Sequence, residues 1–227
     1  FFGRDDVSQP LFWILAAVSM TVGNLIALRQ TNIVRLFAYS SVAQAGYMLA
    51  PLAVAGESVD ARDEALAATV AYLLIYAAMN LGAFAVIMAV ARKTRSGHID
   101  SYGGLLQYAP GLAAVMTVFL FALAGIPPLG GWFAKFVIFR ALLTPGTAAG
   151  YVLAVVVGVN SVIALFYYAR IAQKMWMEEV PDGDTTPIRV PPSLTAALAI
   201  CAGTTIVLGV VPGVFGELAE LATFAGL

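Results

Sequence analysis

Long apolar runs alternate with short polar connections along this chain, and each run is continuous rather than alternating in polarity. A helix needs about 20 apolar residues to cross a bilayer. Runs long enough to do so cover about residues 9–28, 36–55, 65–91, 109–143, 148–168 and 193–211. Because lipid admits only helices and closed barrels, and the two-residue alternation of barrel strands is missing from the sequence, we predict an all-α integral membrane protein with about six transmembrane helices.

The fourth run is too long for one straight crossing. As a single helix, residues 109–143 would extend ~52 Å at 1.5 Å per residue, against a hydrocarbon core of ~30 Å. Prolines remove a backbone donor and clash with the preceding turn, and glycines weaken a helix because their backbone is freer. We therefore predict that the helix is broken at Ile126–Gly131, between halves over about 113–125 and 132–143. The residues expected to make the break are Pro127, Pro128, Gly130 and Gly131.

Lys135 lies just after this break, in the predicted first turn of the second half-helix. A lysine at membrane depth is costly and is functional by default, and transporters place ion sites at broken helices near the midplane. The positive end of the helix dipole and the low polarity of the site both favour the neutral amine. Lys135 is therefore the candidate proton carrier. On position alone, the alternative is a lysine that snorkels to the membrane surface.

Composition excludes a soluble enzyme. The chain is 61% hydrophobic and 11% charged, whereas soluble domains carry about 25% charged residues. A net charge of −1 gives no signal for nucleic acid. One cysteine, Cys201, and one histidine cannot supply a metal cluster, so we expect no cofactor in this chain and a reduced thiol at Cys201. The first residue is Phe1, without a signal-like segment, which suggests a piece of a longer chain.

Lysine and arginine residues are unevenly distributed between the two sets of connections, and this asymmetry predicts orientation. One side carries Arg29, Arg35, Arg92, Lys93, Arg95, Arg170, Lys174 and Arg189. The other carries Arg4, Arg62 and Arg140, together with the acidic loop residues Glu57, Asp60, Asp63 and Glu64. We expect the first side to be cytoplasmic, which places both ends of this chain on the outer side.

Several segments together resemble one known family. They are Gly23–Asn32 (GNLIALRQTN), Arg35–Ser41 (RLFAYSS), Gly46–Leu49 (GYML), Leu81–Ala85 (LGAFA), Ala113–Thr117 (AAVMT), Ala124–Pro128 (AGIPP) and Lys135–Phe136. In these residues the chain resembles the antiporter-like membrane subunits of bacterial respiratory complex I, the NADH–quinone oxidoreductase. Within that family it is most similar to the subunit N group, which is ND-two-like. The resemblance runs from about residue 10 to residue 211.

The family fold implies fourteen helices with two inverted five-helix repeats. Residues 1–175 would then be the second repeat, residues 176–192 a cytoplasmic-side loop, and residues 193–227 the final transmembrane helix with an interfacial tail from about residue 214. The essential glutamate and lysines of the first repeat would lie outside this chain. Many relatives have histidine where Gln44 stands and lysine where Val34 stands.

The resemblance also implies proton translocation coupled to quinone reduction in other subunits, with Lys135 as the proton carrier toward the outside. FMN, iron–sulfur clusters and quinone would belong to the rest of the complex, and the partners would be adjacent membrane subunits and lipids of the bacterial plasma membrane. Polar residues that could order a water chain to Lys135 are Tyr39, Ser40, Ser41, Gln44, Tyr72, Asn80, Thr117 and Asn160, with His98 as a possible proton-entry residue.

Simpler roles remain open for these residues. Each polar side chain could instead hydrogen-bond between helices, His98 could be a solvated loop residue, and the Tyr76, Tyr167, Tyr168 and Trp176 rings are expected to anchor at the interface or to pack. Two other classes of protein also fit the pattern. One is a subunit of a multisubunit sodium/proton antiporter or a membrane-bound hydrogenase, and the other is a non-transporting scaffold subunit with Lys135 paired to an acid on a neighbour.

Overall fold

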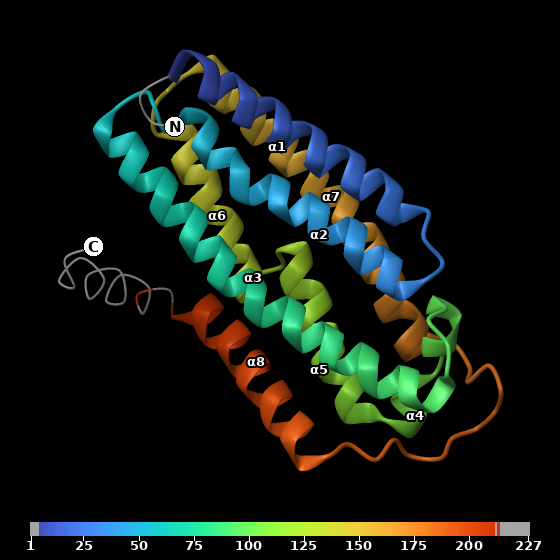
Figure 1. Ribbon diagram of the computed structural model, residues 1–227. Coiled ribbons are helices and arrows are strands. Elements are labelled where there is room, and N and C mark those ends of the chain that lie inside the picture. The colour runs from blue at the N-terminus through green and yellow to red at the C-terminus, as the bar shows by residue number, and fades with distance from the viewer. Residues whose placement is uncertain (1–4, 212, 214–227) are drawn as a thin grey trace.

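The computed structural model describes residues 5–211 and residue 213, so the tail predicted from residue 214 lies outside the described residues. Apart from one isolated bridge between Asn32 and His98, the described backbone consists of helices and connections. The elements are α1 (Asp5–Leu28), α2 (Ile33–Leu49), the 3-10 helix η1 (Ala50–Val54), α3 (Val59–Thr94), the 3-10 helix η2 (Ile99–Tyr102), α4 (Leu105–Tyr108), α5 (Pro110–Ala124), α6 (Gly130–Leu143), α7 (Ala148–Met177) and α8 (Pro192–Val210) (Figure 1).

Among the described residues, four helices are long and apolar enough to cross a membrane, namely α1 from Val7, α3, α7 and α8. The other two predicted crossings are built differently. The second is the 17-residue α2 continued by η1, and the fourth is divided between α5 and α6. α3 begins at Val59, before the apolar run, because the Ser58 side chain accepts a hydrogen bond from the Ala61 N–H at 3.0 Å and caps the helix.

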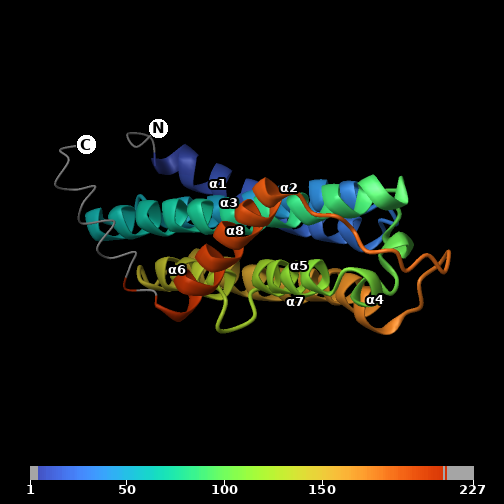
Figure 2. The ribbon, with the colours of Figure 1, turned by 90° about the horizontal axis from the view of Figure 1, so that it is seen from below.

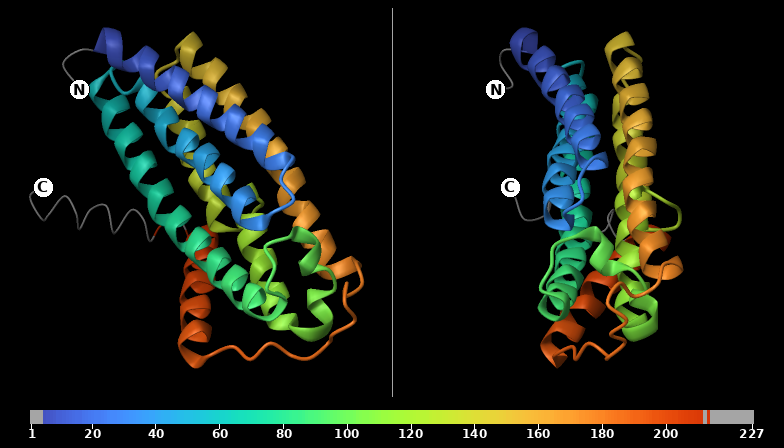
Figure 3. Two further views of the ribbon diagram at one scale, coloured as in Figure 1. Left: turned by 45° about the vertical axis from the view of Figure 1, so that its right-hand side comes forward. Right: turned by 90° about the vertical axis from the view of Figure 1, so that its right-hand side faces the viewer.

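The helices form two layers. α1, α2 and α3 make one layer and α5, α6 and α7 make the other, while α8 crosses obliquely and packs against α3 and α6 (Figures 2 and 3). Small residues bring α1 and α2 together: a Cβ on Gly23 would lie 2.7 Å from the Ala43 nitrogen, and one on Gly46 would lie 2.8 Å from the Ala16 oxygen. Close backbone approach of this kind is how helices associate in lipid, where no hydrophobic force drives them together.

Burial separates a lipid-type surface from a partly polar interior. Large apolar side chains are exposed on the outside, among them Phe166 at 68% and Leu81 at 66%, which fits a protein surrounded by hydrocarbon. Among the residues whose side chains are described, the interior holds apolar and aromatic side chains together with six buried polar residues, which are Asn24, Ser40, Gln44, Lys135, Asn160 and Thr205. Because buried polar groups are costly unless they are hydrogen-bonded, these six residues mark where a functional site can lie.

The connections collect at two ends of the bundle in the arrangement that the charge pattern predicts. The α1–α2, α3–α4 and α7–α8 connections lie at one end, here called the basic end, and the α2–α3 and α6–α7 connections lie at the other (Figure 1). At the basic end, Ile33 N–H bonds to the Gly97 oxygen at 2.8 Å and Ile99 N–H bonds to the Thr31 oxygen at 2.8 Å. These bonds tie the α3–α4 connection to the α1–α2 turn.

Candidate functional site

The predicted interruption of the fourth run is present between α5 and α6. α5 ends at Ala124, and Gly125 adopts a left-handed conformation with φ of 92° that turns the chain out of the helix. The segment from Ile126 to Leu129 contains both prolines and connects the two helices. Residues other than glycine rarely adopt this φ, so Gly125 is the residue that ends α5.

Gly130 and Gly131 do not belong to the break, contrary to the prediction. They form the first turn of α6, which begins two residues earlier than expected. Their missing side chains allow close backbone contact instead: a Cβ on Gly131 would lie 1.8 Å from the Ala122 oxygen, and one on Gly130 would lie 2.9 Å from the Thr205 oxygen. The start of α6 is therefore pressed against the end of α5 and against α8.

Lys135 is enclosed beside the break, with 5% of its surface exposed. Its amine donates a hydrogen bond to the Ala124 carbonyl oxygen at 2.7 Å and lies 4.9 Å from the centre of the Tyr47 ring. The side chain runs along Gly125, where an added Cβ would come within 2.8 Å of Lys135 Cδ. Burial excludes the alternative in which the lysine snorkels to the membrane surface.

The electrostatic setting of Lys135 differs from the prediction. Lys135 is the sixth residue of α6 and so lies in its second turn, beyond the free N–H groups of the first. Its amine instead meets the C-terminal end of α5, where unpaired carbonyls and the helix dipole favour a cation. The prediction that the positive end of α6 acts on this amine is therefore wrong, because the direction taken by a long side chain depends on the fold around it.

A network of amides and phenols extends from the Tyr47 ring, which lies 4.9 Å from the Lys135 amine. Asn24 on α1 is its centre: the Asn24 amide donates to the Asn160 side-chain oxygen at 3.1 Å and to the Tyr47 hydroxyl at 3.5 Å. The Tyr167 hydroxyl donates to Asn24 Oδ1 at 2.9 Å, and the Asn160 amide donates to Thr21 Oγ1 at 3.2 Å. Through Tyr47, whose ring faces the Lys135 amine, this network reaches the break from α1, α2 and α7.

A second polar chain reaches the same end of α5. The Gln44 amide donates to the Leu123 oxygen at 3.5 Å, one residue before the carbonyl that Lys135 binds. Gln44 also accepts a hydrogen bond from the Tyr72 hydroxyl. Ser40 lies one helical turn before Gln44 on α2, and its hydroxyl is hydrogen-bonded to the hydroxyl of Tyr168 on α7. Of the predicted polar residues, Gln44 is therefore hydrogen-bonded to the end of α5 and Tyr72 to Gln44, Asn160 is linked to Tyr47 through Asn24, and Ser40 lies one turn from Gln44 on α2.

Other predicted residues lie elsewhere. Ser41 accepts a hydrogen bond from Tyr76 at 2.7 Å at the margin of this group. Thr117 accepts one from the Trp176 indole at 2.7 Å, near the basic end. The remaining three take no part in the hydrogen bonds around Lys135 that the structure describes: Tyr39 is exposed, Asn80 is half-buried on α3, and His98 is an exposed loop residue.

Sequence reasoning missed Asn24 and Tyr47 as site residues and assigned Tyr167 and Tyr168 only to interface anchoring or packing. All four are buried around the site. Asparagine inside an apolar run was a signal for Asn24, since an amide in lipid needs a partner. A tyrosine in such a run gives no comparable signal, because the same side chain serves at interfaces and in cores.

The site can hold or release a proton in neutral surroundings. An ammonium has three donors, and the structure shows one hydrogen bond from Lys135 to the protein. Across residues 7–211, no acidic side chain forms an ion pair with it. The described residues also contain no group of three or more histidine, cysteine, aspartate or glutamate side chains that could hold a metal ion. The Lys135 amine is a group that can accept and donate a proton.

A helical membrane protein with a buried lysine beside an interrupted helix is the class that this fold and site define. The sequence model described as "NADH:quinone oxidoreductase/Mrp antiporter, TM" matches residues 2–164, and the chain belongs to this family. It is 45% identical over 202 residues to NADH-quinone oxidoreductase subunit N 2 of Sorangium cellulosum, covering 88% of this chain and 38% of that protein.

Other relatives agree with this assignment. F(420)H(2) dehydrogenase subunit N of Methanosarcina mazei is 41% identical, covering 93% of this chain and 43% of that protein. A chain of respiratory complex I from Thermus thermophilus superposes with a TM-score of 0.71 at 32% identity, covering 90% of this chain and 44% of the other. A chain of the Mrp complex from Dietzia shares the fold, with a TM-score of 0.78 at 22% identity, over 96% and 46%. The chain thus spans about two fifths of the length of the curated relatives it matches.

Proposed function

We propose that this chain is the proton-translocating half of a subunit-N-type protein in an NADH:quinone oxidoreductase, and that Lys135 carries the proton. The observation that carries the proposal is the enclosed Lys135 amine at the interrupted helix, bound to the end of α5 and facing a polar network. The subunit N relatives support the assignment to complex I. Redox chemistry, with FMN, iron–sulfur clusters and quinone, would take place in other subunits.

In membrane terms, the chain would cross six times. α2 with η1 would form the second crossing and α5 with α6 the fourth, so that residues 1–175 form the second inverted repeat and α8 the final helix. The basic end would face the cytoplasm of a bacterial plasma membrane, and both ends of the chain would face outward. Neighbouring membrane subunits and lipids would cover the exposed apolar faces.

Each part of the site has a role in this proposal. The carbonyls at the end of α5 stabilise the charged amine, and its neutral surroundings favour release of the proton. Water ordered by Gln44, Tyr72 and the Asn24 network would connect the amine to the two sides of the membrane. The Gln44 amide would order water without titrating, since an amide does not ionise in this range.

The test is replacement of Lys135 in the full complex. Lys135→Met should lower proton pumping about tenfold or more, because the carrier of the proton is gone, while the complex still assembles. Lys135→Arg should also fail, since a guanidinium keeps its proton. Pumping is measured in inside-out vesicles with a pH-sensitive dye, next to NADH:quinone turnover and the amount of assembled complex.

A matched control is Lys174→Met at the basic end, away from the interrupted helix. Lys174 pairs with two solvent-exposed carboxylates, Asp100 at 2.8 Å and Glu178 at 3.0 Å, and ion pairs open to solvent contribute about 0–1 kcal/mol. This variant should pump normally. Normal pumping by assembled Lys135→Met complex would contradict the proposal, and loss of the assembled complex itself would indicate a scaffold role for Lys135.

The main competing function is sodium/proton antiport. It is considered because the chain shares its fold with a chain of the Mrp complex. The Sorangium and Methanosarcina relatives, at 45% and 41% identity, carry subunit N names, whereas the Mrp chain is 22% identical, which favours the redox complex. Co-purification of NADH:quinone activity with the chain separates the two. Sodium-dependent proton exchange without such activity would favour antiport.

A further inference from the structure

A cavity of about 230 Å³ lies at the basic end, between the last turns of α3 and the loop that leads into α8. Apolar side chains form much of its wall, among them Ala89, Ile188 and Leu194. Three of the 12 lysine and arginine residues also line it, namely Arg92, Lys93 and Arg189. Lys135 and its hydrogen-bond partners do not line this cavity, which combines an apolar wall with basic side chains.

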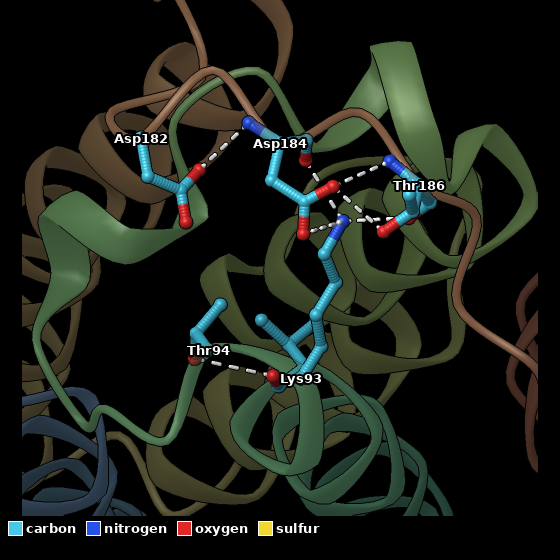
Figure 4. Close-up of polar contacts among 6 residues, drawn as sticks. Lys93, Thr94, Asp182, Asp184 and Thr186 are labelled. Atoms are coloured by element: carbon cyan, nitrogen blue, oxygen red, sulfur yellow. Dashed lines mark hydrogen bonds and ion pairs between the residues drawn. The ribbon is translucent and has the colours of Figure 1, made fainter.

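The Lys93 amine is bound to other groups of the protein. This amine donates to the backbone oxygens of Asp184 at 2.8 Å and Thr186 at 2.6 Å, and it pairs with the Asp184 carboxylate at 3.5 Å (Figure 4). The same carboxylate accepts bonds from the Thr186 N–H at 2.9 Å and from its hydroxyl at 2.7 Å. Lys93 therefore clamps the α7–α8 loop against α3 and places the following residues beside the end of that helix.

Arg92 and Arg189 are brought together by this clamp and remain uncompensated. Both side chains are at least partly exposed, and neither forms an ion pair or hydrogen bond within the part of the chain that the structure describes. The nearby acids do not line the cavity: Asp184 is held by Lys93, and Asp182 accepts the Asp184 N–H at 3.1 Å. The N-terminal turn of α8, where Leu194 lies, borders the same region, so the positive end of the helix dipole is nearby. Pro192 has no N–H, and the Leu194 and Thr195 N–H groups both bond to the Pro191 oxygen at 3.0 Å, so the arginines are the donors offered to a ligand.

We propose that this cavity binds the phosphate headgroup of an anionic phospholipid. Two uncompensated arginines recognise phosphate through charge-assisted hydrogen bonds, and basic pockets on the cytoplasmic side of membrane proteins suit anionic headgroups. α8 runs from the cavity into the membrane, and its exposed side chains include Ile200 and Val207. The acyl chains lie along this surface, which a free phosphate ion would leave unused.

The test compares Arg92→Gln/Arg189→Gln with a control of equal charge change, Arg29→Gln/Arg35→Gln, in the purified full complex. The control arginines are exposed at the same end, on and beside the α1–α2 connection. At about fivefold per basic residue, the affinity for short-chain dioctanoyl phosphatidylglycerol should fall about 25-fold in the cavity variant. It should not change in the control. Binding is followed by native mass spectrometry and by the thermal stability of the complex.

Two further measurements distinguish a lipid headgroup from free phosphate and detect loss of binding that comes only from misfolding. Dioctanoyl phosphatidylcholine and inorganic phosphate should each fail to replace the anionic lipid. Arg92→Lys/Arg189→Lys keeps the charge and should retain part of the affinity, since only the paired guanidinium bonds are lost. Equal affinity in cavity and control variants, equal binding of inorganic phosphate, or a neighbouring subunit seated in the cavity would each overturn the proposal.

Discussion

At the scale of single residues, the contact between Lys135 and α5 depends on Gly125. This glycine has a φ of 92° and lies directly under the lysine side chain. The same residue thus ends α5, which leaves the Ala124 carbonyl without a helical partner, and leaves space for the amine to reach that carbonyl. One position provides both the acceptor and the access to it.

Gly125→Ala should therefore disturb the site more than the fold. An alanine at this φ costs about 1–2 kcal/mol, and its Cβ would lie 2.8 Å from Lys135 Cδ, which displaces the amine from Ala124. We expect a clear fall in proton pumping with a smaller fall in assembled complex. Gly111→Ala is the control, because that Cβ meets nothing within 4 Å; it should pump as the parent does. Equal pumping by both variants would contradict the role given to Gly125.

At the scale of elements, α8 closes the break between α5 and α6. A Cβ on Gly209 would lie 2.1 Å from the Pro128 oxygen and 2.4 Å from the Leu129 carbonyl carbon. Thr205, also on α8, is fully buried against the start of α6. Unwound backbone at membrane depth needs protein around it, and α8 supplies that cover on one side.

Gly209→Ala should weaken this closure. The contacting atoms are backbone and cannot move aside cheaply, so we expect a loss of about 1–3 kcal/mol in stability. Gly203→Ala on the same helix meets nothing within 4 Å and should stay within about 1 kcal/mol of the parent. Thermal unfolding of the complex in detergent measures both. Matching melting temperatures for the two variants would show that α8 does not pack tightly on the break.

The α7–α8 loop should respond to pH through Asp184. Hydrogen bonds from the Thr186 hydroxyl and N–H, with the charge of Lys93, lower the pKa of Asp184 from its ordinary value of 3.8. A lowered pKa means that the loop is fully stabilised above pH 3.8 and loses this contribution as the pH falls through the lower folded-state value. Hydrogen exchange of the loop amides, corrected for intrinsic rates, should accelerate in that acidic range.

Asp184→Asn provides the comparison for this pH effect. It removes the titrating group, so its loop should show no acceleration over the same range while exchanging faster than the parent at about pH 6, where the parent carboxylate is charged. An identical acid response in parent and variant would mean that another group controls the loop.

At the scale of the whole molecule, the two ends of the helix bundle carry different charges, and the surface between them is apolar. Basic connections gather at one end, and the acidic α2–α3 connection lies at the other, where Arg140 on α6 pairs with Glu64 on α3. Exposed apolar side chains lie between the two ends. This arrangement fits a body that spans a bilayer with its basic end in the cytoplasm.

Cysteine labelling tests this orientation. In a Cys201→Ala background, Glu57→Cys and Thr185→Cys place thiols at exposed positions of opposite ends. A membrane-impermeant maleimide added to right-side-out membranes should label Glu57→Cys alone, and inside-out vesicles should give the reverse. Labelling of both positions from one side would refute the transmembrane arrangement.

The helical runs, the interruption near Pro127 and the separation of charged connections could all be predicted from the sequence. Each depends on properties of short segments: a run of apolar side chains favours a helix in lipid, and proline prevents a helix from continuing whatever surrounds it. The family resemblance also rests on local blocks of sequence. The start of α6 was misplaced because Gly130 and Gly131 look like helix breakers locally, whereas their role is set by α5 and α8.

The sequence by itself determined that this is a helical membrane protein with a lysine beside a broken helix. Only the tertiary structure decided where that lysine points and what surrounds it. Asn24 and Asn160 are 136 residues apart in the chain and meet only because α1 packs on α7. In the same way, Arg92 and Arg189 share a cavity because Lys93 holds a distant loop. Contacts between remote segments depend on packing, which no local pattern encodes.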